Sequence, residues 1–158
     1  MSISLDEYAA DPRLILSYHA VPNQWILQGG TVGGGGVMRW IEKELGDYER
    51  SIAKECGKSS LVQFNELAEK VPAGSDGLIF LPYMSGERSP IWDPNAKGVY
   101  YGLDFSKTKG HLIRAAMEGV AYSLKHNLDI RRKDRSESRR TARNGWICKL
   151  SSLDTDQM

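Results

Sequence analysis

Residues 85–118 constrain the fold more than any other part of the chain, because turn, strand and helix patterns follow one another there without a break. Two proline-containing turns come first, and each proline fixes φ and removes a backbone donor. Residues 99–103 are rich in β-branched and aromatic side chains, which favours a short strand. Thr108 is placed to cap a helix. Close approach of that helix to a sheet is indicated by its small residues, Ala115, Ala116, Gly119 and Ala121.

Residues 29–36 form the stretch richest in glycine, between a predicted strand over 25–30 and a predicted helix from Val37 to Leu45. A glycine turn that opens a helix lets backbone N–H groups meet an anion or a nucleotide. No Gly-Lys-Ser/Thr follows, and the glycine spacing does not fit a dinucleotide fingerprint. The residues alone therefore leave two interpretations, an anion site or close backbone packing.

The rest of the chain up to residue 130 reads as alternating short elements. Strands are predicted at 14–16 and 78–81, and charged helical patterns run from Glu42 to Ala53 and over 64–70. The charges on these helices are typical of a solvated face. His19 is expected at the surface or at a strand edge.

Composition excludes several classes of function. Hydrophobic residues make up 41% of the chain and charged residues 26%, with 21 basic against 20 acidic side chains. This balance argues against a nucleic-acid-binding protein. The chain has neither a membrane-length apolar run nor a signal peptide pattern, which predicts a cytoplasmic protein. Cys56 and Cys148 match no metal spacing and are expected to be reduced thiols.

The stretch from residue 86 to residue 118 resembles the FGGY carbohydrate kinases, and most closely their xylulose kinase branch. Residues 86–94 contain Gly-Glu-Arg-Ser-Pro and then Asp-Pro, which resembles a loop of the pentulose and gluconate kinases. The resemblance covers about residues 10–130. The family's second signature is matched at each constrained position, by Gly98, Tyr100, Gly102, Leu103, His111, Leu112, Ala115, Ala116, Met117 and Glu118.

This resemblance implies an incomplete α/β lobe of the ribonuclease H-like type, as in the actin, hexokinase and Hsp70 superfamily. In the family, two lobes close on ATP, Mg²⁺ and a sugar, and an aspartate acts as base on the sugar hydroxyl. We expect a fragment of an ATP-dependent kinase for xylulose, a related pentulose or gluconate. The fragment is expected to lack the base aspartate and the N-terminal lobe and to be inactive alone; a homodimer is an option for the intact enzyme.

The resemblance also assigns site residues. The helix start after the glycines lies under the nucleotide in the family, which assigns Gly35 and, at a variable position, Arg39 to ATP binding. Glu87 and Arg88 are expected near the cleft between the lobes, where a guanidinium can order the loop or approach phosphate. From the residues alone, a solvated or salt-bridged Arg88 is the simpler interpretation. No residue is assigned as catalytic or as a metal ligand.

His111 and Glu118 are signature positions to which we assign structural roles. The sequence implies no acidic or hydroxyl partner beside His111. We therefore expect His111 to cap the helix or to pack against it rather than to act as a base.

The composition changes abruptly after Ile130, and residues 131–140 contain no apolar side chain. The nucleotide-gripping Thr-Gly-Gly loop that follows this helix in the family is missing. A one-base shift of the reading frame turns the codons of Trp146 and Ile147 into a glycine codon, and allowed codons for 139–145 then give Glu-Glu-Leu-Arg-Ala-Thr-Gly. We predict a partial kinase domain over 1–130 and a frameshifted, disordered tail over 131–158.

Two functions of other classes stay open at this point. A non-catalytic nucleotide-binding or interaction module built on the same lobe would have no upstream reading frame that supplies the aspartate. A nucleic-acid binder would use the basic tail, and its salt-dependent binding would disappear when 131–158 are deleted.

Overall fold

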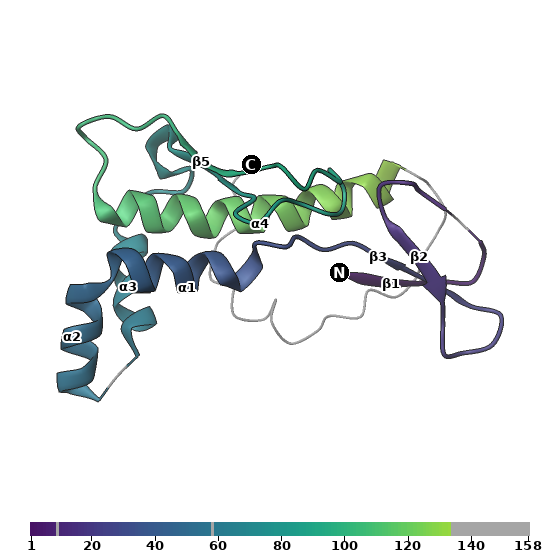
Figure 1. Ribbon diagram of the computed structural model, residues 1–158, viewed down its shortest axis with the longest axis horizontal. Coiled ribbons are helices and arrows are strands. Elements are labelled where there is room, and N and C mark those ends of the chain that lie inside the picture. Colours follow the sequence, from purple (N-terminus) through teal and green to yellow (C-terminus); the bar gives the residue numbers. More distant parts are fainter. Residues whose placement is uncertain (9, 58, 134–158) are drawn as a thin grey trace.

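The computed structural model describes residues 1–8, 10–57 and 59–133. One long helix runs along most of the molecule, and the shorter elements pack beside it (Figure 1). In chain order the elements are β1 (Ser2–Leu5), β2 (Ile15–Tyr18), β3 (Trp25–Gln28), α1 (Gly34–Leu45), α2 (Asp47–Cys56), α3 (Ser60–Glu69), the 3-10 turn η1 (Ser75–Gly77), β4 (Ile79–Pro82), β5 (Gly98–Tyr101) and α4 (Lys109–Lys133).

The helix α4 takes part in both hydrophobic cores. Its small residues Ala115 and Ala116 are buried in the main core. Gly119 lies so close to β4 that a Cβ would stand 2.2 Å from the carbonyl oxygen of Phe80, which confirms the predicted approach to a sheet. Ile130, near the other end, belongs to the second core. Neither α4 nor any other helix in the described part of the chain is both long and apolar enough to cross a membrane.

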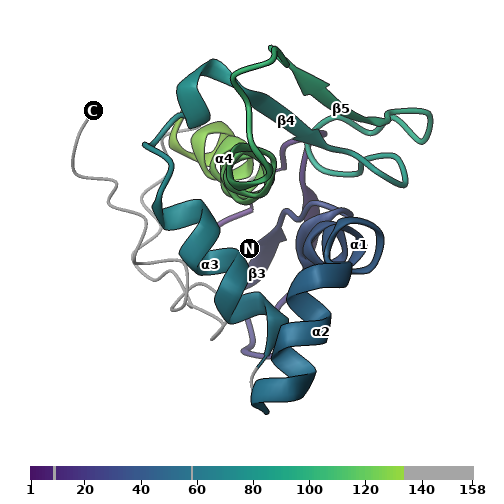
Figure 2. The same ribbon diagram turned by 90° about the vertical axis from the view of Figure 1, so that its left-hand side faces the viewer.

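The main core lies on both sides of the first half of α4. Figure 2 views α4 nearly end-on, with the β4–β5 pair on one side of it and α1 and α3 on the other. Apolar side chains from all of these layers meet there, as their 3.6-residue and 2-residue periodicities require. The buried members are Val37, Ile41, Phe64, Ala68, Leu78, Phe80, Ile113, Ala115 and Ala116.

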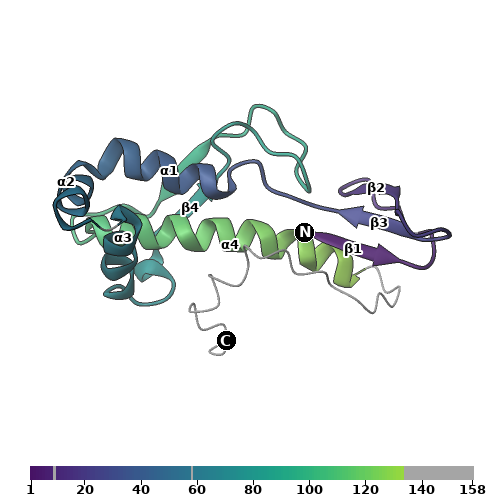
Figure 3. The ribbon, with the colours of Figure 1, turned by 90° about the horizontal axis from the view of Figure 1, so that it is seen from below.

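The second core lies between the C-terminal part of α4 and an antiparallel sheet of order β1-β3-β2. Figure 3 shows this sheet beyond the C-terminal half of the helix. The strands β2 and β3 agree with those predicted at 14–16 and 25–30, whereas β1 was not predicted. Ile3 and Leu5 of β1 are buried and alternate with half-buried serines, so a signal of period two was present, but only over four residues.

The helical pattern from Glu42 to Ala53 is broken at Gly46, where α1 ends and α2 begins. Gly46 is buried, and a Cβ there would lie 2.5 Å from the carbonyl oxygen of Glu42 and 2.7 Å from Phe64 Cζ. The break lets α2 turn away while Phe64 of α3 fills the corner. Glycine is required because only hydrogen fits between the two segments.

Tyr100 fastens the β4–β5 pair to α4 and gives a test of this packing. Its hydroxyl donates to the carbonyl oxygen of Leu112 at 3.0 Å, and its ring lies 4.5 Å from that of Phe80. Burial raises the pKa of Tyr100 to about 12. Because an unfolded tyrosine ionises near pH 10, its contribution to the free energy of unfolding is complete below about pH 10 and is lost as the pH rises through the folded-state pKa.

We expect Tyr100→Phe to lower the free energy of unfolding by about 1 kcal/mol at neutral pH, through the lost hydrogen bond. Above about pH 10 the variant should lose less stability with rising pH than the wild-type chain, as measured by urea unfolding. Tyr48→Phe is the control, because the Tyr48 side chain is 68% exposed. A steeper loss in Tyr100→Phe than in the wild-type chain would contradict the assignment.

Candidate functional site

The glycine turn, residues 29–33, connects β3 to α1 and is packed tightly at both ends. A Cβ on Gly29 would lie 2.4 Å from Asn127 Oδ1, and one on Gly33 would lie 2.1 Å from the carbonyl oxygen of Pro82. The turn is therefore fitted between the end of α4 and the end of β4. Close backbone packing, one of the two interpretations of this stretch, holds at these two positions.

The start of α1 has the features of an anion site. No side chain caps the helix at Gly33, and its first turn carries no acidic residue. The first backbone bond runs from the Val37 N–H to the carbonyl oxygen of Gly33 at 3.1 Å, so the N–H groups before Val37 have no helical acceptor. Gly34 and Gly36 have open space where a Cβ would stand. The N-terminus of a helix favours negative charge.

Gly35 and Arg39 lie on the same face of α1, because they are four residues apart in one helix. Gly35 is half-buried in the first turn, and Arg39 is exposed one turn later. The structure therefore places both residues assigned to the nucleotide beside the open helix start. An exposed guanidinium can reach a phosphate bound there.

Glu87 contacts the glycine turn directly. Its side chain is 4% exposed and accepts hydrogen bonds from the Thr31 hydroxyl at 2.5 Å and from the Val32 N–H at 2.9 Å. The pKa of Tyr83 is raised, mainly because its hydroxyl is partly buried and also because the negative charge of Glu87 lies nearby. Sequence reasoning placed Glu87 in a functional loop but found no partner for it, because Thr31 is 56 residues away.

Arg88 is exposed and makes no ion pair within the described residues. Its backbone N–H donates to Glu87 Oε1 at 2.8 Å. The two charged residues of the loop thus separate, with Glu87 buried against the glycine turn and Arg88 facing solvent. The solvated interpretation of Arg88 fits this part of the chain.

The loop over residues 85–95 is fixed by bonds within it and by further long-range bonds besides those of Glu87. The Glu87 N–H donates to the carbonyl oxygen of Asp93 at 2.8 Å. At the tip, Trp92 Nε1 donates to the carbonyl oxygen of Arg13 at 3.1 Å. Arg13 is itself held by Asp11, and the hydrogen bonds from Arg13 lower the pKa of that carboxyl. The loop is a rigid support for the glycine turn.

His111 has the acidic and hydroxyl partners that the sequence did not imply, so that expectation was wrong. Its Nε2 lies 3.0 Å from Asp76 Oδ2, and its Nδ1 lies 2.8 Å from Thr108 Oγ1. Because the Thr108 N–H also donates to Nδ1, at 3.1 Å, the ring proton is placed on Nε2 and points at Asp76. The predicted capping role is confirmed, with His111 reaching back to the residue before α4.

Glu118 holds the same turn as His111, from one side of α4. It is 8% exposed and accepts from the Gly74 N–H and the Ser75 hydroxyl, each at 3.0 Å. Arg114 Nε donates to it at 2.7 Å. The structural role assigned to Glu118 fits these contacts.

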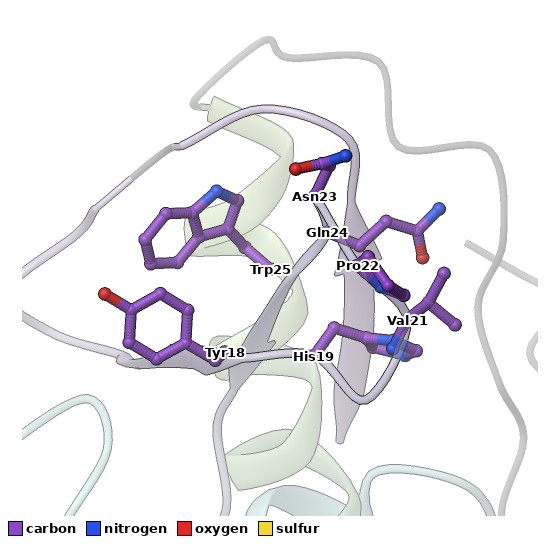
Figure 4. Close-up of a pocket in the computed structure, with 7 residues that line it drawn as sticks. All are labelled: Tyr18, His19, Val21, Pro22, Asn23, Gln24 and Trp25. Atoms are coloured by element: carbon purple, nitrogen blue, oxygen red, sulfur yellow. The ribbon is translucent and has the colours of Figure 1, made fainter.

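Two hollows of the surface lie away from the glycine turn. One of about 390 Å³ is formed at the β2–β3 hairpin, where Figure 4 shows Tyr18 and Trp25 side by side, with ring centroids 4.7 Å apart. His19 lines it and accepts from the Val21 N–H at 2.9 Å, which agrees with its expected place at a strand edge. A second hollow, of about 300 Å³, lies between α2 and α3. Neither contains a residue of the glycine turn.

The described residues do not form a metal-binding cluster. In residues 1–8, 10–57 and 59–133, no three His, Cys, Asp or Glu side chains are grouped so that they could hold an ion. The open helix start fits a phosphate, whereas the described residues offer no carboxylate cluster for Mg²⁺.

Comparison with known proteins first defines the class. The fold is that of the sugar-kinase lobes in the actin and hexokinase superfamily: the chain superposes on xylulose kinase from Rhodospirillum rubrum with a TM-score of 0.69 and 36% identity, covering 84% of this chain and 25% of that one. Gluconate kinase from Lactobacillus acidophilus superposes with a TM-score of 0.71 and 32% identity, covering 87% of this chain and 26% of that one. The predicted fold class is confirmed.

The family follows from the sequence. The sequence model of the FGGY family of carbohydrate kinases, C-terminal domain, matches residues 5–145. The chain belongs to this family. It is 43% identical over 110 residues to a gluconokinase of Bacillus licheniformis, covering 70% of this chain and 21% of the relative. A xylulose kinase of Escherichia coli (strain K12) is 32% identical over 112 residues, with coverages of 71% and 21%. The chain thus spans about a fifth of the length of these relatives.

The predicted boundary at residue 130 stays a prediction. The helix α4 continues to Lys133, and the family match extends to residue 145. The frameshifted, disordered tail predicted over 131–158 lies, from residue 134 onward, outside the described residues.

Gly33 offers a sharp test of the glycine turn. Its φ of −65° suits any residue, so alanine there is opposed by close contacts alone, chiefly with the carbonyl oxygen of Pro82 at 2.1 Å and also with Val37 Cγ2 at 3.3 Å. We expect Gly33→Ala to lower the free energy of unfolding by about 1–3 kcal/mol in urea unfolding. Gly36→Ala, on the open side of the same helix, should be neutral or raise it by about 0.5–1 kcal/mol. Equal effects of the two substitutions would contradict the packing described.

Proposed function

We propose that the chain is the nucleotide-binding part of an ATP-dependent carbohydrate kinase, which transfers the γ-phosphate of ATP to a sugar hydroxyl. The observation that carries this proposal is the uncapped start of α1, with Gly35 and Arg39 on one face. Membership of the FGGY family supports it. The sugars proposed are xylulose, a related pentulose or gluconate, because similar proteins carry the names xylulose kinase and gluconokinase.

The proposed contribution of this chain is to bind and orient the nucleotide. The N–H groups at the start of α1 would face the phosphate side of ATP, and Arg39 would add a positive charge beside it. ATP supplies the phosphoryl group when bound, and Mg²⁺ is proposed to accompany it. No described residue is assigned to Mg²⁺ or to the base that deprotonates the sugar hydroxyl. We therefore propose that the 158-residue chain alone binds nucleotide without phosphorylating sugar.

We further propose a cytoplasmic protein whose partner is a small sugar, with neither a nucleic acid nor a membrane as partner, and with a homodimer as an option for the intact enzyme. The near-balanced charge, 21 basic against 20 acidic residues, supports the exclusion of nucleic acid. A non-catalytic nucleotide-binding module would use the same helix start, but no contact in the structure favours it over the kinase.

Two substitutions on α1 test the nucleotide site. Gly35→Asp places a negative charge in the first turn of the helix and should weaken ATP and ADP binding at least about tenfold, since phosphate would meet a like charge. Arg39→Ala should weaken it by about three- to tenfold. Isothermal titration calorimetry of the full chain measures both effects.

Lys54→Ala on α2 removes one exposed positive charge away from the site and should leave the dissociation constant unchanged. Failure of the wild-type chain to bind ATP or ADP at millimolar concentration would overturn the proposed site. Release of ADP when xylulose or gluconate is added would show that the chain phosphorylates sugar by itself, against our expectation.

A further inference from the structure

Glu87 is a buried carboxylate that joins two segments far apart in the chain. It accepts from Thr31 and Val32 of the glycine turn, 56 and 55 residues away, and from the N–H of its neighbour Arg88. No ion pair within the described residues includes Glu87. Its charge is therefore stabilised by oriented N–H and O–H donors, and separating the segments would remove the donors Thr31 and Val32 and leave only the Arg88 N–H.

The turn held by Glu87 leads straight into the proposed nucleotide site. Thr31 and Val32 directly precede Gly33, whose carbonyl oxygen accepts the first backbone bond of α1 from Val37. On the other side Gly33 rests on the carbonyl oxygen of Pro82, at the end of β4. Glu87 and Pro82 thus fix the start of α1 from two directions. The contact at Pro82 comes from β4, and the contact at Glu87 comes from the loop that carries Arg88.

We propose that Glu87 is a positioning residue that couples loop 85–95 to the nucleotide site. The inference rests on the proposed function, because the site concerned is the start of α1. Since the loop and the turn share one buried carboxylate, a displacement of either shifts the other. By reciprocity, a ligand that orders the loop and a nucleotide at α1 strengthen each other's binding by the same factor.

Glu118 provides a matched control within the same chain. It is also buried, and it accepts one backbone N–H and one hydroxyl, from Gly74 and Ser75; unlike Glu87, it also pairs with Arg114. The turn that it holds lies before β4, at the other end of that strand from Pro82. Glu118→Gln therefore removes the charge of a buried carboxylate, as Glu87→Gln does, at a turn that does not lead into α1, and it also breaks the ion pair with Arg114.

The experiment measures ADP and ATP binding by calorimetry and thermal unfolding for Glu87→Gln, Thr31→Val and Glu118→Gln in the full chain. We expect Glu87→Gln to weaken nucleotide binding about tenfold, within the range usual for coupled sites. Glu118→Gln should lower the melting temperature but keep the dissociation constant within about twofold. Thr31→Val should also weaken nucleotide binding. The double substitution should bind nucleotide no more weakly than Glu87→Gln alone, because both substitutions act on the same contact between Thr31 and Glu87.

Equal nucleotide affinities of Glu87→Gln, Thr31→Val and the wild-type chain would overturn the inference while leaving the proposed function intact. If the wild-type chain binds no nucleotide, the proposed function fails, and amide hydrogen exchange without nucleotide decides the coupling. Glu87→Gln should then speed exchange in both residues 30–40 and 85–95, and Glu118→Gln only around residues 74–77. Faster exchange confined to 85–95 in Glu87→Gln and Thr31→Val would overturn the coupling.

Discussion

The contact on which the structure depends is the close approach of α4 to β4. A helix can lie this near to a strand only where its side chains are small, and Gly119 leaves room for the carbonyl oxygen of Phe80, which a Cβ would meet at 2.2 Å. With β4 fixed, its last residue Pro82 sets the position of Gly33 and so the start of α1. The geometry of the proposed nucleotide site is thus inherited from the main core.

Two buried carboxylates, Glu87 and Glu118, hold two turns in place through hydrogen bonds. The turns at 29–33 and 74–77 have few side chains to bury, so packing alone cannot fix them. Glu87 and Glu118 each satisfy a backbone N–H and a hydroxyl of a turn from an element distant in sequence. The geometry of such bonds is directional, whereas hydrophobic burial is not, and each turn is held in one conformation.

Elements with a clear period were predictable from the sequence, and contacts between distant residues were not. The strand at 99–103, the helix after Thr108 and the glycine turn before α1 appear as expected. The break at Gly46 depends on Phe64, which approaches from another helix. Val32, a partner of Glu87, lies 55 residues away, and Asp76, the acidic partner of His111, lies 35 residues away; no local pattern carries that information. The residue types of the site were predictable, but their pairing was not.

Three residues of the family signature, Gly102, His111 and Glu118, pack around one turn. Gly102 has φ +88°, and a Cβ there would lie only 2.8 Å from the carbonyl oxygen of Gly77. His111 and Glu118 form hydrogen bonds with Asp76 and Ser75, the two residues before Gly77. None of these signature residues lies at the start of α1. A chain can therefore keep the signature, and the fold that it specifies, independently of whether it keeps the chemistry. The signature identifies the lobe, and the proposed nucleotide site lies outside the signature, at the glycine turn with its Glu87 contact.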